Sequence, residues 1–260
     1  MTLLRRVVTA VVVGLGLVLV GASPSWAAAA TPSPTASAPT VTVQLPGADG
    51  GDGPNSSIVL LLALTVLAVA PAILLLTTSF TKIIVVLSLT RNALGLQGVP
   101  PNQVLVGLSL FLSLFIMGPV VSQVNQDALQ PYLNGDATFS QAFDAAKKPM
   151  TEFMLKNTRP EELALMVKVS KEPAPATPAD VSLTTLIPAF ILSELRAAFI
   201  IGFVIFVPFL VIDMVVSAGL MSVGMMMLPP VMISLPFKLL LFVLVDGWGL
   251  VVTSLVSSYG

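Results

Sequence analysis

Long apolar runs with very few charges constrain this chain more than any other feature of its sequence. Of its 260 residues, 55% are hydrophobic and only 10% are charged, whereas a soluble domain carries about a quarter charged residues. Such a chain has too little polar surface to face water on all sides. The runs cover 58–90, 103–124, 183–220 and 231–255. The sequence therefore predicts an all-α polytopic membrane protein with about four kinked hydrophobic segments in two hairpins.

The kinks are predicted from polar and proline residues inside the runs. The first run is interrupted by Pro71 and by the polar patch TTSFTK at 77–82. The later runs contain Pro188, Pro208 and Pro236. Proline within a membrane helix is tolerated where the freed backbone groups find partners or line a wet cavity. We expect the first run to break near Pro71 or at the polar patch.

The N-terminal part has the pattern of a secretory signal peptide at 1–28. Basic Arg5 and Arg6 precede the apolar stretch 7–20, and small residues follow it; an uncleaved anchor helix is the alternative. Residues 29–57 are rich in Ala, Thr, Pro, Ser and Gly, a composition typical of a disordered tail. Cleavage would leave this tail outside the cytoplasm.

That orientation places the hairpin 58–124 with both ends on the external side. The segment 125–185, which carries most of the remaining charges, then becomes a small external helical insert. Its stretch MTEFMLKNTRPEELALMVKV predicts one or two short amphipathic helices around Pro160. The second hairpin, 186–260, contains a Met-rich loop.

Ionisable side chains inside or beside the apolar runs are candidate functional residues, because a charge at the bilayer centre costs about 2.5–3.5 kcal/mol and is normally paired or hydrated. They are Lys82, Glu194, Arg196, Asp213, Lys238 and Asp246. Glu194 is expected to have a partner, whereas Lys238 can also snorkel to the interface. Asp246 is interpreted as a helix cap or as a contact to a neighbour.

Catalysis is disfavoured by what the sequence lacks. Without Cys or His, the chain has no thiolate ligand and lacks the commonest general base and metal ligand. Asp213 and Asp246 suggest a pair of protease carboxylates. Their contexts, VIDMVV and LVDGWG, do not have the glycine-flanked motif of intramembrane aspartyl proteases. The net charge of −1 gives no support for nucleic-acid binding. We expect no enzyme activity, metal or cofactor.

Three consecutive methionines, Met225, Met226 and Met227, precede Leu-Pro-Pro at 228–230. Methionine is apolar and adaptable, so it fills irregular gaps. The run is either lipid-facing filler or, repeated around an axis, a soft apolar gasket; periodicity does not choose between them.

Two blocks of this sequence resemble the FliP family, membrane subunits of the flagellar type III export gate. The first is LTTSFTKIIVVLSLTRNALGLQGVPPNQVLVGLSLFLSLFIMGPV at 76–120. The second is PAFILSELRAAFIIGFVIFVPFLVIDMVVSAGLMSVGMMMLPPVMISLPFKLLLFVLVDGW at 188–248.

The resemblance implies a helical ring of about five copies, joined by FliR-like and FliQ-like subunits and served by FlhB-like and FlhA-like export proteins. This assembly lies in the inner membrane at the flagellar basal body and passes unfolded rod, hook and filament subunits. It implies that Met225–Met227 form the pore gasket and that Glu194 and Lys238 are assembly charges, paired within or between subunits.

Two other functions remain open. A homologous injectisome subunit would share the fold and gasket, although the signal peptide and the NALG…PPN loop favour the flagellar branch. A secondary transporter could build a site from Glu194, Arg196 and Asp213, but the sequence has no internal repeat to support one.

Overall fold

The computed structural model describes residues 54–171, 175, 177, 180–225 and 228–260. Every regular element in that part of the chain is a helix, which confirms the all-α expectation there. The elements are α2 (Pro54–Leu76), α3 (Phe80–Ala93), α4 (Asn102–Ile116), α5 (Gly118–Val124), the π-helix η1 (Asn125–Leu129), α6 (Gln130–Asn134), α7 (Phe139–Asn157), α8 (Pro160–Ser170), α9 (Leu183–Ser222), α10 (Pro230–Leu244) and α11 (Gly247–Ser257). The expected signal peptide lies outside the described residues, as does the expected tail up to residue 53; residues 54–57 belong to α2.

Among the described helices, α9 alone is long and apolar enough to span a membrane as a single rod. Three further pairs pass the same test together but are bent. The bends are 64° between α2 and α3, 61° between α4 and the stretch 118–134, and 61° between α10 and α11. The structure therefore contains at least one apolar span, and up to four if each bent pair is one. The kinked character of the segments agrees with the sequence, while the number of spans stays a prediction.

The first apolar run breaks at residues 77–79, within the polar patch, and Pro71 lies inside α2. Helix ends leave carbonyl groups without hydrogen-bond donors. The hydroxyl groups of the patch donate to carbonyls at the end of α2. The Thr77 hydroxyl donates to the Ile73 carbonyl at 3.0 Å, and the Thr78 hydroxyl donates to the Leu75 carbonyl at 3.1 Å. The residues at the break thus satisfy the end of α2 locally.

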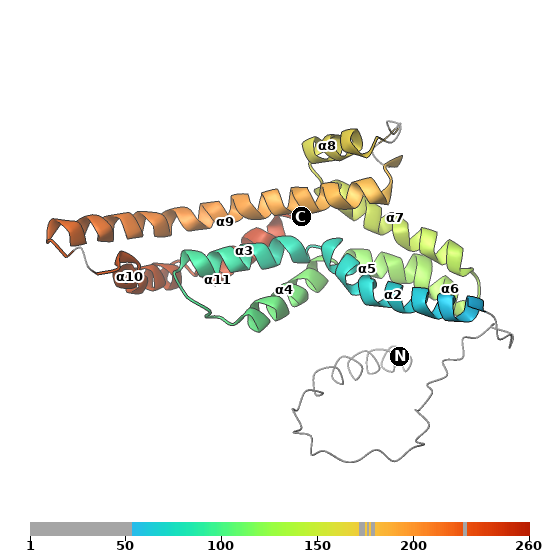
Figure 1. Cartoon of the computed structure of the whole chain (residues 1–260), viewed down its shortest axis with the longest axis horizontal. Helices are drawn as coiled ribbons and strands as arrows, with labels where there is room; N and C mark the ends of the chain where they lie inside the picture. The colour runs from blue at the N-terminus through green and yellow to red at the C-terminus, as the bar shows by residue number, and fades with distance from the viewer. Residues whose placement is uncertain (1–53, 172–174, 176, 178–179, 226–227) are drawn as a thin grey trace, which may run out of the picture. The chain divides into compact units, whose positions relative to one another are not determined.

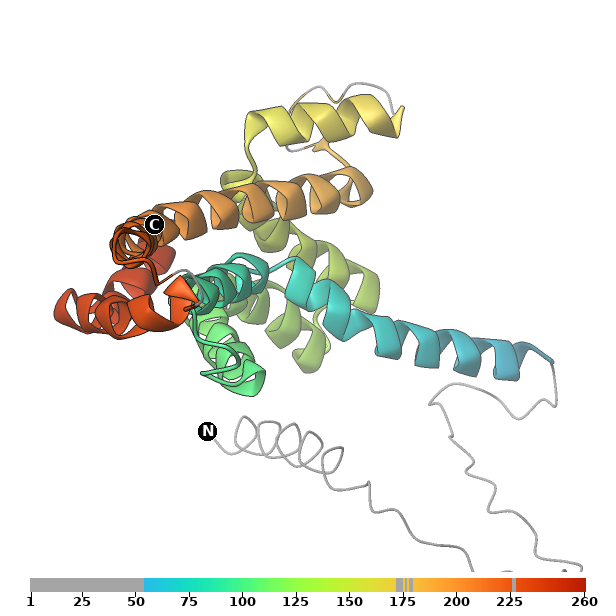
Figure 2. The ribbon, with the colours of Figure 1, turned by 60° about the vertical axis from the view of Figure 1, so that its left-hand side comes forward.

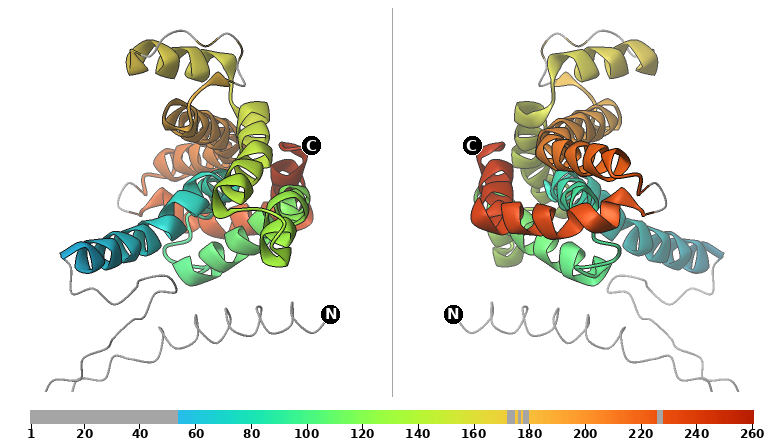
Figure 3. Two further views of the ribbon diagram at one scale, coloured as in Figure 1. Left: turned by 90° about the vertical axis from the view of Figure 1, so that its right-hand side faces the viewer. Right: turned by 90° about the vertical axis from the view of Figure 1, so that its left-hand side faces the viewer.

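Helix α9 is the centre of the packing. Helix α8 lies beside the start of α9, and α3 lies on the opposite side along the middle of α9, where Ala93 packs near Phe209 (Figures 1 and 3). The largest buried cluster joins α3, α4, α9 and α11 through Ile83, Val86, Leu87, Leu105, Ala198, Val251 and Leu255. At Gly202 the helices α9 and α3 approach closely, since a Cβ there would lie 2.3 Å from Leu89 Cδ1.

The charged insert is helical on both sides of Pro160, as expected. Helix α7 begins with a capping box, in which the Thr138 hydroxyl accepts from the Gln141 amide and the Gln141 side chain accepts from the Thr138 amide. It ends at Asn157, and α8 begins at Pro160, where the missing proline N–H costs nothing. Met154 of α7 packs with Leu186 and Phe190 at the start of α9.

Apolar surfaces are left uncovered at several places in the described chain, among them α2 and the second half of α9. Helix α2, which projects away from the other helices in Figure 2, exposes apolar side chains on all sides. These include Leu61, Leu64, Val66, Leu67, Ile73 and Leu74. The second half of α9 exposes Phe203, Val204, Val207, Val211, Met214 and Val215.

Candidate functional site

A largely buried polar cluster surrounds the break between α2 and α3, and we call it the break cluster: Ser79, Lys82, Ser113, Glu194, Tyr259 and, at its exposed edge, Ser258. At its centre Lys82, in the first turn of α3, meets Glu194 of α9. Lys82 Nζ lies 3.1 Å from Glu194 Oε1, and the two side chains are only 4% and 1% exposed. Buried ion pairs need further hydrogen bonds to offset their desolvation, and the rest of the cluster provides them.

Tyr259, which follows α11, closes this cluster. Its hydroxyl donates to Glu194 Oε2, and its oxygen lies 3.4 Å from the Ser79 carbonyl oxygen. Lys82 Nζ stands 3.6 Å from the centre of the Tyr259 ring and donates to Ser258 Oγ at 3.3 Å. The ammonium over the ring face is a cation–π contact. Both oxygens of Glu194 therefore have donors.

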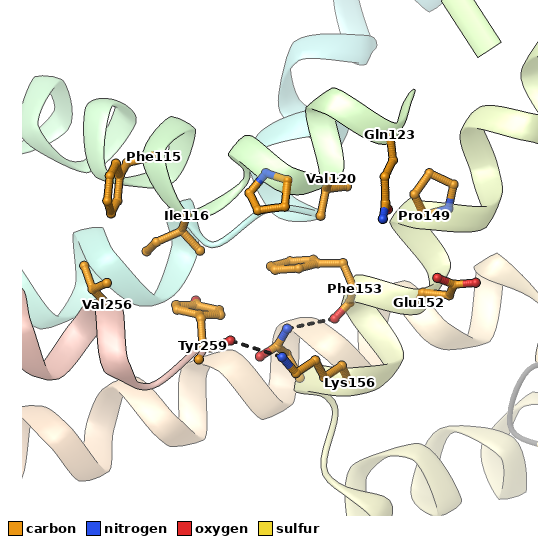
Figure 4. A pocket seen from close by; sticks show the side chains of 13 residues that line it. Phe115, Ile116, Val120, Gln123, Pro149, Glu152, Phe153, Lys156, Val256 and Tyr259 are labelled. Carbon is orange, nitrogen blue, oxygen red and sulfur yellow. Dashed lines mark hydrogen bonds between the residues drawn. The ribbon is translucent and has the colours of Figure 1, made fainter. Parts of the chain in front are cut away.

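Ser79 extends the cluster to a further helix, because its hydroxyl donates to Ser113 Oγ of α4 at 3.1 Å. Tyr259 also reaches the insert. Its ring stacks on Phe153 of α7 with the centroids 6.0 Å apart, and Lys156 Nζ lies 3.5 Å from its carbonyl oxygen. Figure 4 shows these rings on the wall of an open, mainly apolar pocket of about 510 Å³.

A second polar cluster, the hairpin cluster, consists of Asp213, Ser234, Lys238 and the Ala93 carbonyl. Lys238 Nζ of α10 lies 2.6 Å from Asp213 Oδ2 of α9, and Ser234 donates to Asp213 Oδ1 at 2.5 Å. Lys238 also donates to the carbonyl of Ala93, the last residue of α3, at 3.4 Å. The lysine side chain is 3% exposed and the aspartate 27%. This cluster ties α10 to α9 and to the end of α3.

The two expected assembly charges thus have different partners. Glu194 pairs with Lys82, and Lys238 pairs with Asp213. Sequence reasoning did not single out Ser113, Ser234 or Tyr259. Serine and tyrosine are ordinary residue types, and only the tertiary packing brings these three residues close to the ion-paired side chains.

The other candidate charges lie closer to the surface. Arg196 NH1 donates to Glu162 Oε1 of α8 at 2.7 Å, and the arginine side chain is 53% exposed. The hydrogen bond from Arg196 lowers the pKa of Glu162 below its ordinary value. Asp246 occupies the N-cap position of α11 with φ of 50°, and its side chain makes no capping hydrogen bond there. Among the described residues, no group of acidic side chains is arranged to hold a metal ion.

The loop between α9 and α10 is described only in part. Val223, Met225 and Leu228 are exposed, and Gly224 has φ of 76°, a conformation that glycine adopts without strain. Met226 and Met227 lie outside the described residues. The gasket therefore stays a prediction.

Comparison with known proteins identifies close relatives. The model of the FliP family matches residues 63–255. The chain is 56% identical over 205 residues to the flagellar biosynthetic protein FliP of Bacillus subtilis (strain 168), covering 79% of this chain and 93% of that protein. The proteins of the same name from Pectobacterium carotovorum subsp. carotovorum and Aquifex aeolicus (strain VF5) are 50% identical over 214 residues and 48% identical over 205 residues. These matches cover 82% and 78% of this chain, and 83% and 86% of the respective relatives.

Proposed function

The chain belongs to the FliP family, and from this premise we propose that it is a pore-forming subunit of the flagellar type III protein export gate. In this role it passes unfolded rod, hook and filament subunits across the inner membrane. The chain acts as a structural element of the channel and not as an enzyme. The N-terminal tail and the insert lie on the external side.

The observation that carries the proposal beyond family membership is the length of α9. At about 1.5 Å per residue, its 40 residues extend about 60 Å, twice the roughly 30 Å hydrocarbon core of a bilayer. Only 11% of its most apolar stretch is buried in its own chain. A single bilayer crossing does not cover so long an apolar helix unless the helix is steeply tilted. The first part of α9 packs on α3, α7 and α8 of its own chain, and neighbouring subunits would cover the apolar side chains that its second half exposes.

The assembly we propose is a ring of about five copies with FliR-like and FliQ-like subunits, contacted by FlhB-like and FlhA-like export proteins. The ion pairs support a particular role for the assembly charges. Glu194 and Lys238 are already neutralised within the chain. They therefore act on assembly by fixing the helices that carry the intersubunit surface. Asp213, with its partly exposed carboxylate, offers the edge at which a neighbour can join.

Within the ring, we assign the closed seal to Met225, Met226 and Met227. The support is that the described neighbours Val223 and Leu228 are exposed apolar residues beyond the end of α9. Exposed apolar residues at this end of α9 are suited to meet their copies around an axis. Methionine can repack after a chain has passed.

The native mass of the detergent-extracted protein tests the assembly, with the chain expressed alone and together with its FliR-like and FliQ-like neighbours. We expect a homo-oligomer that gains both neighbours, and hook-protein secretion that depends on it. A monomer or dimer that ignores these neighbours would overturn the proposal. Secretion of injectisome effectors in place of hook protein would assign the chain to that branch.

The seal is tested by replacing Met225, Met226 and Met227 together with Ala. We expect intact assembly with increased ion leakage and salt-sensitive growth. The matched control replaces three exposed methionines outside the run with Ala, namely Met214, Met221 and Met232. If the variant with all three loop methionines replaced leaks no more ions than the control variant, the proposed seal would be refuted.

A further inference from the structure

The direction of helix α2 is set at its base. The described part of α2 is exposed on all sides, and its packing within the chain is concentrated next to α3. Only its last turns, at Ile73 and Leu74, share a small pocket with α7 and the start of α9. A helix so poorly covered along its length does not fix its own orientation, so the angle of 64° to α3 must be held at residues 77–79.

Hydrogen bonds at the break divide into two groups. Thr77 and Thr78 bond back to carbonyls of α2 itself, so they terminate the helix without tying it to the remainder of the chain. Ser79 is fully buried and is the residue that reaches other elements. Its hydroxyl bonds Ser113, and its carbonyl oxygen faces the Tyr259 hydroxyl.

Tyr259 is the residue on which these contacts converge. It touches the break at Ser79, the ion pair at Glu194 and Lys82, and the insert at Phe153. It lies after residue 255, where the match to the family model ends. We propose that Tyr259 is a positioning residue: its phenol holds the α2–α3 break against α9 and α7 and so fixes the direction of α2 relative to both.

The hydroxyl and the ring have separate tasks in this arrangement. The hydroxyl supplies the donor to Glu194 Oε2, while Lys82 serves Oε1. The ring supplies the stacking surface for Phe153 and the face toward the Lys82 ammonium. Tyr259→Phe therefore removes the hydrogen bond to Glu194 and keeps the ring contacts. Tyr259→Leu removes both the hydrogen bond and the ring contacts. The consequence for export rests on the proposed function, whereas the effect on the direction of α2 does not.

Distances between pairs of spin labels test the proposal on the full chain in lipid nanodiscs. The sequence contains no Cys, so introduced cysteines label uniquely. One pair is placed at Val66 of α2 and Val204 of α9, both exposed, and a reference pair at Val204 and Val215 within α9. We expect one narrow distance distribution for the first pair in the parent, a broader one in Tyr259→Phe and the broadest in Tyr259→Leu.

The reference pair should stay unchanged in every variant, and Tyr132→Phe, which alters a tyrosine on α6, serves as the matched control with no effect on either pair. An unchanged Val66–Val204 distribution in both Tyr259 variants would overturn the proposal. Equal broadening of the reference pair would also overturn it, because Tyr259 would then support the helices in general. The native mass of the same variants reports on assembly separately, so failure of the export-gate function remains distinguishable.

Discussion

The break cluster and the hairpin cluster are both lysine–carboxylate pairs between apolar helices, yet they differ in how completely the chain encloses them. In the break cluster both side chains are almost fully buried, whereas in the hairpin cluster Asp213 keeps an open edge. The side chains of a fully buried pair can form hydrogen bonds and ion pairs only with groups of their own chain. An open pair can exchange a lost partner for water or for a group of a neighbouring subunit.

This difference in burial indicates that the two lysine–carboxylate pairs have different roles. The break cluster joins α3, α4 and α9 to Tyr259, so it belongs to the architecture of the single subunit. The hairpin cluster lies between α9 and α10. The Met-rich loop joins the end of α9 to the start of α10. The open side of the cluster leaves the Asp213 carboxylate accessible to water or, in the proposed ring, to a neighbouring subunit.

The largest effect is expected from Lys82→Met, which leaves Glu194 as an uncompensated buried charge. Breaking one partner of a buried pair costs about 3–5 kcal/mol. We expect that loss of stability in thermal unfolding of the detergent-solubilised protein, together with loss of the oligomer. The double variant Lys82→Met with Glu194→Gln should recover part of it, because no unpaired charge remains.

Lys148→Met, at an exposed position of α7, is the control for that experiment and should leave unfolding nearly unchanged. A Lys82→Met protein as stable as this control would show that water reaches Glu194. The contrast between a closed and an open cluster would then be lost.

Gly202 lies on α9 between the two clusters and tests how closely α3 packs against α9 there. A Cβ at Gly202 would meet three atoms of Leu89, at 2.3, 3.1 and 3.2 Å. Gly202→Ala should therefore destabilise by about 1–3 kcal/mol through overpacking, measured by thermal unfolding. Adding Leu89→Ala should restore much of the loss.

Gly219→Ala supplies the matched change, since a Cβ there meets nothing within 4 Å. In a helix this change should stabilise by about 0.5–1 kcal/mol. Equal behaviour of the two alanine variants would contradict the close approach of α3 and α9.

Much of this fold could be predicted from the sequence, because helix formation in apolar runs is governed by local composition. The break at 77–79 followed from the hydroxyl residues of the polar patch, and the insert helices followed from spacing around Pro160. Pro71 was the weaker signal, because a proline near the middle of an apolar helix removes one donor without offering a new end.

The pairing of the charges could not be predicted, because it depends on which helices meet. All four paired residues were among the candidate charges of the sequence, but which lysine meets which carboxylate is decided by the packing of α3 and α10 against α9. Tyr259 gave no signal at all, since a single tyrosine after a helix is common at membrane interfaces. The seal, the ring and the number of spans stay predictions.

A smaller effect is expected at the open edge of the hairpin cluster. Asp213→Asn keeps an oxygen for Lys238 or for Ser234 and removes only the charge. Lys238 is buried and loses its counter-ion, but it keeps the new amide oxygen and the Ala93 carbonyl as acceptors. We therefore expect a loss of about 1.5 kcal/mol, the lower end for a hydrogen bond to a charged group. Thermal unfolding measures it against Asp144→Asn, an exposed position. A loss as large as that of Lys82→Met would show that the hairpin cluster is closed in the assembled protein.

The smallest effect concerns the most exposed pair, Arg196 with Glu162, and it depends on pH. The hydrogen bond from Arg196 holds the pKa of Glu162 below its ordinary value of 4.5. A carboxylate with a lowered pKa stabilises the folded state above its unfolded value, and this contribution is lost as pH falls through the folded value. Docking of α8 on α9 should therefore weaken only below pH 4.5. Because Arg196 is half-exposed, solvent and salt screen the pair and keep the effect small.

Amide hydrogen exchange in α8 measures that docking, with each variant compared to the parent at the same pH so that intrinsic exchange rates cancel. Glu162→Gln should exchange faster than the parent at pH 7 and approach it below pH 4.5, while the exposed neighbour Glu161→Gln should match the parent throughout. Identical exchange in Glu162→Gln and the parent at pH 7 would mean that apolar packing alone holds α8. The ordering of ion pairs by enclosure would then rest on the break cluster and the hairpin cluster alone.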